Sequence, residues 1–372
     1  MKKSMSSPPS LNRFTSNLDR LTEWFQRALI FGAFLGALSP GVLLPALIGL
    51  APADGWAQTQ SPPALIQNRE VTRQIMQSVV ALQVSADPES PSSRNLGQQR
   101  IGTGVVIGEN LILTVGYLLI EAEDIDVVDH QQRRLPAALT AYDPTSGFGL
   151  VKTLVPLKLQ PIRLGDSDGL KLPRRLLTLG QSEKELTELF LVSRKPYAGN
   201  WEYLVEAPLM TIPAVNNWSG AGLFDDEGAL LGIGSLVVAD ATGGFNPRPG
   251  NLYLPINLLK PILGDLIEKG RRSGPAQAWL GIHSQPHPEG GLLVQRVSPD
   301  GPAELAGLQR GDRILAIDNA VISDLSDFYR RLWAKGPAGI QVELTLLREG
   351  VSRKLRVTSG DRLASLRKPK GV

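Results

Sequence analysis

The sequence contains no cysteine and only three histidines among its 372 residues. The lack of cysteine excludes disulfide scaffolds, thiolate zinc sites, iron–sulfur clusters and a cysteine nucleophile. Any chemistry that needs histidine has three candidates, His130, His283 and His287. The 39 Lys and Arg nearly balance the 36 Asp and Glu, and the formal charge of +3 is spread along the chain. The charge pattern therefore does not indicate a nucleic-acid partner.

Turn-forming residues, by contrast, are plentiful, with 38 glycines and 28 prolines, and 42% of the chain is hydrophobic. This composition predicts a globular chain with many turns and a real core, long enough for two domains. Short apolar runs such as GTGVVIG (102–108), NLILTVG (110–116) and NLYLPI (251–256) alternate with turn signals. Their spacing predicts an antiparallel barrel or sandwich.

A long apolar run covers residues 28–50, with Lys and Arg before it and the small residues Gly55 and Ala57 after it. This pattern predicts a signal peptide over residues 1–57, cleaved after Ala57. The alternative is an uncleaved membrane anchor, because the run is just long enough to span a bilayer. Either interpretation places the rest of the chain outside the cytoplasm, in the periplasm if the source is a Gram-negative bacterium.

Composition divides the remainder of the chain at a segment rich in Gly, Pro and charge, GRRSGPAQ. The predicted order is a flexible lead-in (58–69), a first domain (70–269), a linker (270–277), a second domain (278–360) and a solvated basic tail (361–372). Within the first domain we expect a short helix over 70–80, an exposed loop over 87–99 and a closing amphipathic helix over 258–269.

The second domain contains the most specific string, GPAELAGLQRGDRILAIDNAVI (301–322). Gly301 and Pro302 predict the start of a short helix and Gly307 its end. Gly311 and Asp312 then predict a turn into a strand. This string resembles the signature of PDZ domains, which implies an α+β fold.

PDZ domains bind a peptide C-terminus by strand addition and hold its carboxylate with backbone N–H groups of a glycine-containing loop. The residues that resemble this loop are Trp279, Leu280, Gly281 and Ile282. The opposite wall would be a helix over about 324–335, with Phe328, Leu332 and Arg331 nearest the ligand. The alternative is a PDZ domain used only for internal packing. His283 and His287 follow the loop without a third ligand, so we expect a surface loop and no metal.

A β-barrel followed by a PDZ domain behind a signal peptide resembles the HtrA/Deg family of serine proteases. The resemblance covers most of residues 75–360, and its motifs lie at 102–119, 124–153, 164–181 and 216–235. It implies a mainly β fold, a chymotrypsin-like double β-barrel followed by the PDZ domain. It also implies assembly into a trimer.

The same resemblance assigns the triad positions, and two of the three are degenerate. Ser219 retains the nucleophile position, whereas Tyr117 stands at the base position and Gly147 at the acid position. Tyrosine is a poor base at neutral pH and glycine has no side chain to orient one. Asn217 replaces the glycine of the oxyanion loop, and Trp218 lies between it and the serine. Trp218 either fills the former specificity cleft or lines an apolar groove.

Three other residues are candidates to replace the missing base or acid. His130 is expected at a hairpin turn, Lys152 follows a structural strand, and Asp143 has no histidine to orient. None of them is expected to activate Ser219.

The function expected from the sequence is that of an exported HtrA-like pseudoprotease that binds peptides or unfolded-protein C-termini in protein quality control or regulation. One alternative is an active serine endopeptidase that uses Ser219, and another is a membrane-tethered scaffold if residues 28–50 are retained. No cofactor is expected.

Overall fold

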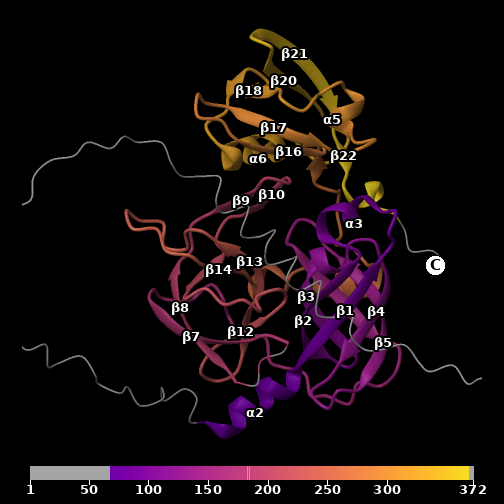
Figure 1. Ribbon diagram of the computed structural model, residues 1–372, viewed down its shortest axis with the longest axis vertical. Helices are drawn as coiled ribbons and strands as arrows, with labels where there is room; N and C mark the ends of the chain where they lie inside the picture. The colour runs from indigo at the N-terminus through magenta and orange to yellow at the C-terminus, as the bar shows by residue number, and fades with distance from the viewer. Residues whose placement is uncertain (1–67, 182, 184, 368–372) are drawn as a thin grey trace, which may run out of the picture. The chain divides into compact units, whose positions relative to one another are not determined.

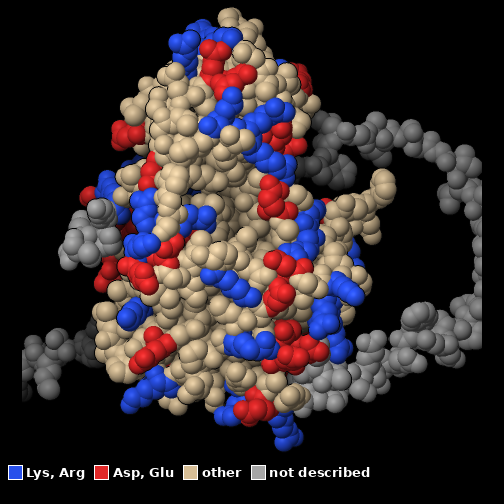
Figure 2. Space-filling model, turned by 180° about the vertical axis from the view of Figure 1, so that it is seen from behind, with Lys and Arg blue, Asp and Glu red and all other residues tan. Residues whose placement is uncertain are grey.

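The computed structural model describes residues 68–181, 183 and 185–367 of the chain (Figure 1). The predicted signal peptide over 1–57, most of the lead-in and residues 368–372 of the tail lie outside the described residues. Among the helices that are described, none is both long and apolar enough to cross a membrane. On the face shown in Figure 2, Lys and Arg are interspersed with Asp and Glu, as the small net charge implies.

The described chain begins with helix α2 (Arg69–Ser78), whose first turn is capped by the Asn68 side chain. The Asn68 Oδ1 accepts hydrogen bonds from the backbone N–H groups of Glu70 and Val71, which have no partner within the helix. The helix thus begins just inside the predicted lead-in. It ends at Ser78, because the β-branched Val79 and Val80 continue as a strand.

The exposed loop expected over 87–99 contains a short helix, α3 (Pro91–Leu96). Ser90 caps it and accepts a hydrogen bond from the Ser93 N–H, and Pro91 occupies the first helical position. Ser90 and Ser92 are buried, so the expectation of an exposed loop was wrong for this part of the segment.

The first barrel is a closed sheet in the order β1-β2-β3-β6-β5-β4 (Figure 1). Its strands are β1 (Val79–Ala86), β2 (Gln99–Gly108), β3 (Leu111–Val115), β4 (Ala122–Val128), β5 (Arg134–Tyr142) and β6 (Phe148–Thr153). Alternate residues of β1 point inward, as the period of two predicts. Only glycine fits at position 104 of β2, because a Cβ there would lie 2.4 Å from Ile112 Cγ2.

The second barrel closes in the order β11-β14-β13-β12-β7-β8. Its strands are β7 (Arg174–Leu179), β8 (Thr187–Ser193), β11 (Leu209–Ile212), β12 (Gly222–Phe224), β13 (Leu230–Val238) and β14 (Gly250–Pro255). Between β8 and β11 the chain forms a separate hairpin of β9 (Tyr197–Gly199) and β10 (Tyr203–Val205). We call residues 197–205 the β9–β10 hairpin.

The amphipathic helix expected over 258–269 is shorter than predicted. The chain forms a 3-10 turn, η3 (Ile256–Leu258), and then helix α4 (Leu263–Lys269). Pro261 explains the difference, because proline lacks an N–H and disfavours helical geometry in the residue before it. Gly270 ends α4 in a left-handed conformation with φ +69°.

The C-terminal domain is built on a sheet in the order β16-β17-β18-β20-β21, with β19 paired to β18. The elements are β15 (Ala278–Trp279), β16 (Ile282–Pro286), β17 (Leu292–Val297), α5 (Pro302–Leu305), β18 (Arg313–Ile317), β19 (Ala320–Val321), α6 (Leu325–Ala334), β20 (Gln341–Arg348), β21 (Val351–Thr358), β22 (Gly360–Asp361) and η4 (Leu363–Ser365). The Asp324 side chain caps α6 by accepting from the Asp327 N–H. The predicted fold, a double β-barrel followed by an α+β domain, is confirmed.

The start of the expected basic tail, residues 361–367, is part of the fold. Asp361 pairs with Ala278 in the two-stranded sheet β15-β22. The Arg362 guanidinium donates to the Trp201 carbonyl at 3.1 Å, and the Arg367 N–H donates to Glu121 at 3.0 Å. These residues satisfy polar groups of other elements, which explains why they do not extend into solvent.

Candidate functional site

Tyr117 is positioned by a short turn that follows β3, the 3-10 helix η2 (Gly116–Leu119). Arg100 of β2 holds the C-terminal side of this turn, with its guanidinium donating to the Ile120 carbonyl at 2.6 Å and to the Tyr117 carbonyl at 3.2 Å. The Gly116 N–H donates to the Gly147 carbonyl at 2.7 Å. The residue before the expected base position is therefore hydrogen-bonded to the expected acid position.

Ser219 lies in a loop that is held by strands from both barrels. Its carbonyl accepts a hydrogen bond from the Thr103 N–H of β2 at 2.8 Å, and the next N–H, of Gly220, donates to Gly234 of β13 at 2.8 Å. Gly220 has φ +79°, and a Cβ there would lie 2.0 Å from the Thr103 carbonyl oxygen. Only glycine fits this close approach, which fixes the position of the serine.

The side chains of Tyr117 and Ser219 are in hydrogen-bond contact. The Tyr117 hydroxyl donates to Ser219 Oγ at 2.9 Å and to the Ser235 carbonyl at 3.1 Å, so one proton is shared between two acceptors. Burial raises the pKa of Tyr117 to about 12, although the hydrogen bond to Ser219 opposes the rise. At pH 7 roughly one molecule in 10⁵ would carry the phenolate. A catalytic base must accept the proton of the serine, and Tyr117 instead presents one.

Gly147, at the expected acid position, carries no carboxylate, and a side chain from another element lies against it. Gly147 has φ +84°, and a Cβ there would lie 2.4 Å from the Tyr203 hydroxyl oxygen. That hydroxyl comes from β10 and donates to the Ser146 carbonyl at 2.9 Å. This role of Tyr203 was not predicted from the sequence. No local pattern marks it, because Tyr203 and Ser146 are 57 residues apart.

Asp143, four residues before Gly147, is engaged elsewhere. Its carboxylate is 3% exposed and accepts two hydrogen bonds from the Arg272 guanidinium, at 2.9 Å and 2.6 Å. It also accepts from the N–H and hydroxyl of Ser146. Asp143 therefore anchors the expected linker to the barrel.

The other residues weighed as a base do not hydrogen-bond Ser219. Within the described residues, the hydrogen bonds of Ser219 are those to Tyr117 and Thr103. His130 is exposed in the turn after β4 and lines a cavity together with Arg133 and Gln160. Lys152 is exposed on β6.

The residues at the expected oxyanion loop, Asn217 and Trp218, contact other parts of the chain. The Asn217 amide donates to Glu183 at 3.4 Å, and the same carboxylate accepts from the Gly180 N–H at 2.7 Å. A Cβ on Gly180 would lie 2.6 Å from Asn217. Trp218 is half-buried, and its carbonyl accepts from the Ala221 N–H. Asn217 is thus tied to the loop after β7.

The expected carboxylate loop of the C-terminal domain, residues 279–282, does hold a carboxylate. The Leu280 N–H donates to Glu202 Oε2 at 2.8 Å and the Ile282 N–H donates to Glu202 Oε1 at 2.6 Å. Gly281 between them has φ +83°, a conformation that favours glycine. Glu202, which comes from the β9–β10 hairpin, was not among the residues predicted for this loop.

The expected wall of the groove, helix α6, contacts the same hairpin through a residue next to Phe328. Phe328 and Leu332 are fully buried in the core of the domain. Tyr329 has a hydroxyl that donates to the Gly199 carbonyl at 2.7 Å and accepts from the Glu202 N–H at 3.1 Å. Arg331 pairs with Asp327 on its own helix. Tyr329 is thus the α6 residue whose hydroxyl bridges both sides of the hairpin loop.

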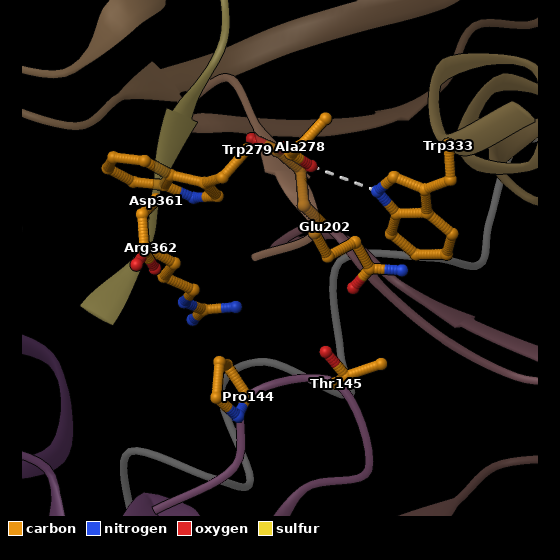
Figure 3. Close-up of a pocket in the computed structure, with 9 residues that line it drawn as sticks. Pro144, Thr145, Glu202, Ala278, Trp279, Trp333, Asp361 and Arg362 are labelled. Carbon is orange, nitrogen blue, oxygen red and sulfur yellow. Dashed lines mark hydrogen bonds between the residues drawn. The ribbon is translucent and has the colours of Figure 1, made fainter. Parts of the chain in front are cut away.

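A small cavity adjoins the carboxylate loop and is lined by Trp279, Glu202 and Arg362, among others. Figure 3 shows the Arg362 guanidinium extending into this cavity between Trp279 and Pro144. In the same view the Trp333 indole donates to the Ala278 carbonyl at 3.0 Å. The positive charge of Arg362 therefore lies close to the buried Glu202.

His283 and His287 have separate partners. His283 Nε2 lies 2.9 Å from the Arg296 guanidinium, and burial together with the charges of Arg296 and Arg362 lowers the pKa of His283 to about 4. His287 Nδ1 lies 3.1 Å from Arg313. Among the described residues, no group of three His, Asp or Glu side chains is arranged to hold a metal ion.

The burial of Glu202 leads to a pH prediction. Burial raises the pKa of Glu202 from 4.5 to about 7. The hydrogen bonds from the N–H groups of Ile282 and Leu280 and the charge of Arg362 oppose this rise. Between pH 4.5 and 7, Glu202 keeps its proton in the folded protein and has released it in the unfolded chain. Wild-type stability should therefore fall as the pH rises from 4.5 to 7, by at most about 1.4 kcal/mol per unit.

The glutamine side chain of the variant Glu202→Gln has nearly the shape of glutamate but cannot ionise. The free energy of unfolding of the variant should therefore rise relative to that of the wild type as the pH increases from 4.5 to 7. Urea unfolding of both proteins at pH 5, 6, 7 and 8 measures the difference, and the titration of all other groups cancels in the comparison. A difference that does not change with pH would show that the pKa of Glu202 is not raised.

Comparisons with known proteins agree with this architecture. A family model described as a trypsin-like peptidase domain matches residues 102–233, and one described as a PDZ domain matches residues 278–358. A probable periplasmic serine endoprotease DegP-like of Pseudomonas fulva is 28% identical over 295 residues, which cover 74% of this chain and 60% of that protein. The periplasmic serine endoprotease DegP of Salmonella typhimurium is 26% identical over 281 residues, which cover 69% of this chain and 57% of that protein.

The chain thus spans about 60% of the length of these curated relatives. Among solved structures, a variant of the HtrA-type protease AlgW with a tripeptide matches with a TM-score of 0.50 and 23% identity. The match covers 80% of this chain and 97% of that one, and it supports the fold. The two matched domains, their order and the relatives lead to one conclusion: the chain contains a trypsin-like peptidase domain followed by a PDZ domain, and in this arrangement it is similar to the DegP-like and HtrA-type proteases.

Proposed function

We propose that this protein is a catalytically silent member of the HtrA family that works by binding peptides or unfolded-protein C-termini in protein quality control or regulation. The observation that carries the proposal is the contact of Tyr117 with Ser219, in which the residue at the expected base position donates a hydrogen bond to the nucleophile. Gly147 supplies no acid at the third position, and Tyr203 occupies the space. Triad members act as a unit, so the loss of two of them removes the activation of the serine.

The binding half of the proposal is supported by the loop of residues 279–282. Its N–H groups already hold a carboxylate, which is the chemical group that a peptide C-terminus presents. Export through the signal peptide 1–57, a periplasmic location and trimeric assembly are parts of the proposal. The relatives named above are periplasmic by name.

An active serine endopeptidase is the second candidate, because Ser219 is retained and the relatives are named as serine endoproteases. A fluorophosphonate probe separates the two, since it labels a serine only when that serine is activated. We expect the purified protein to be labelled no more than its Ser219→Ala variant, and casein to remain uncleaved. An active HtrA protease serves as the positive control, and circular dichroism confirms that both proteins are folded.

Labelling of the wild type that disappears in Ser219→Ala would overturn the silent-site proposal. It would show that Ser219 is activated by a group other than Tyr117. Background labelling of both proteins would leave binding as the role of the chain.

A further inference from the structure

The PDZ groove of this chain contains a segment of the chain itself. Three parts of a PDZ domain contact a peptide C-terminus: the carboxylate loop, the exposed edge of the neighbouring strand and the facing helix. In the structure all three contact the β9–β10 hairpin, residues 197–205.

The first contact is the carboxylate loop. Both oxygens of Glu202 accept backbone N–H groups, from Leu280 at 2.8 Å and from Ile282 at 2.6 Å. The Glu202 residue is 6% exposed. A glutamate side chain thus occupies the position that the terminal carboxylate of a peptide would take.

The second contact is the sheet edge. Strand β16 lies at the end of the sheet order, with β17 on its one paired side. On its other side the Ser284 N–H donates to the Asn200 carbonyl at 3.0 Å. An added peptide strand would need this same edge.

The third contact is helix α6. The Tyr329 hydroxyl donates to the Gly199 carbonyl and accepts from the Glu202 N–H. Ala198 and Leu204 of the hairpin pack against the hydrophobic core of the domain. Glu202 itself has φ +56°, a left-handed conformation that is unfavourable for glutamate and persists where surrounding contacts hold it.

We propose that the β9–β10 hairpin is an internal ligand of the PDZ domain, and that a peptide with a free C-terminal carboxylate binds by displacing Glu202 from the carboxylate loop. This rests on the proposed peptide-binding function, whose regulation it describes. The donors at Leu280 and Ile282 cannot serve two carboxylates at once, so the hairpin and the peptide compete. If the groove is free in about one molecule in ten or fewer, the apparent affinity for a peptide falls about tenfold or more.

The first test measures the contact itself by amide hydrogen exchange of residues 279–284 in the purified protein. Removing the carboxylate with Glu202→Ala should speed exchange in this segment at least about tenfold, because the donors lose their acceptor. Glu206→Ala is the matched variant: it removes another carboxylate of the same region, which pairs with Arg330 of α6 at 2.7 Å in an exposed position. An exposed pair contributes little, so exchange should rise less than about threefold.

The second test measures competition, with fluorescein-labelled octapeptides that end in Ala, Val, Leu or Phe and carry a free or an amidated C-terminus. Fluorescence anisotropy should show that Glu202→Ala binds at least one free-carboxylate peptide about tenfold or more tightly than the wild type, and the amidated form much more weakly. Glu206→Ala should stay within about threefold of the wild type.

The outcomes separate the two proposals. Unchanged exchange in Glu202→Ala would overturn the internal ligand. So would tight peptide binding by the wild type that Glu202→Ala does not improve. Faster exchange in Glu202→Ala without binding of any peptide would overturn the peptide-binding function and the displacement step that rests on it.

Discussion

Arg272→Ala should lower the free energy of unfolding by about 3 kcal/mol, because it leaves a buried carboxylate without its cationic partner, with hydrogen bonds from Ser146 remaining. Asp143 is 3% exposed and accepts two hydrogen bonds from the Arg272 guanidinium. Urea unfolding of the purified variant measures the loss. The Arg272 side chain is 33% exposed, so water can reach the vacated position in part, and the loss should fall at the lower end of the range for broken buried pairs.

The neighbouring arginine provides the control. Arg271 pairs with Asp361 at 3.2 Å, and its side chain is 46% exposed. Arg271→Ala should therefore cost less than about 1 kcal/mol. Adding Asp143→Asn to Arg272→Ala removes the unpaired charge and should recover part of the loss. Equal effects of the two arginine variants would show that the burial of Asp143 does not matter to stability.

Tyr117→His should leave Ser219 unreactive with a fluorophosphonate probe, at a rate about 10⁴-fold or more below that of an active HtrA protease. An imidazole is shorter than a phenol, so its Nε2 would end short of the position from which the Tyr117 hydroxyl contacts Ser219 Oγ at 2.9 Å. It would lack the carboxylate that orients it, because position 147 is glycine. The loss of that acid alone costs about 10⁴ in serine proteases.

Adding Gly147→Asp should not restore the site, because the space is occupied. A Cβ at residue 147 would lie 2.4 Å from the Tyr203 hydroxyl, and the φ of +84° is unfavourable for any residue with a side chain. We expect the double variant to lose about 2 kcal/mol of stability or more from strain and overpacking, with labelling still at background. Tyr203→Phe in the same background should recover part of that stability.

The probe rate and the urea midpoint of each variant test these expectations. Rapid labelling of the single variant Tyr117→His would mean that another group orients the imidazole. The acid position would then not be the decisive loss.

Local sequence signals determined most of the architecture. Alternating apolar strands separated by turns predicted an antiparallel barrel or sandwich, and the resemblance to the HtrA/Deg family specified a double β-barrel. The GPAELAGL and GDRILAID strings predicted a short helix and a strand. These signals can be recognised in the sequence because each depends on residues only a few positions apart. The two errors in helix prediction were also local. Ser90 and Pro91 form a cap and first-turn pair that indicates α3, and Pro261 marks the break before α4.

The sequence likewise placed Tyr117, Gly147 and Ser219 at the triad positions, through their motifs. That Tyr117 donates to Ser219 Oγ was decided by the tertiary structure, since the two residues lie 102 positions apart. The tertiary structure likewise decided that the Tyr203 hydroxyl lies beside Gly147.

By itself, then, the sequence determined the fold class, and its resemblance to the HtrA/Deg family predicted the carboxylate loop and the degenerate triad positions. Only the tertiary structure decided what fills the vacated space and what occupies the loop. Arg272 reaches Asp143 across 129 residues, and Leu280 reaches Glu202 across 78. No periodic pattern encodes such pairs, because they form only when closed barrels and a packed domain bring distant segments within hydrogen-bond distance.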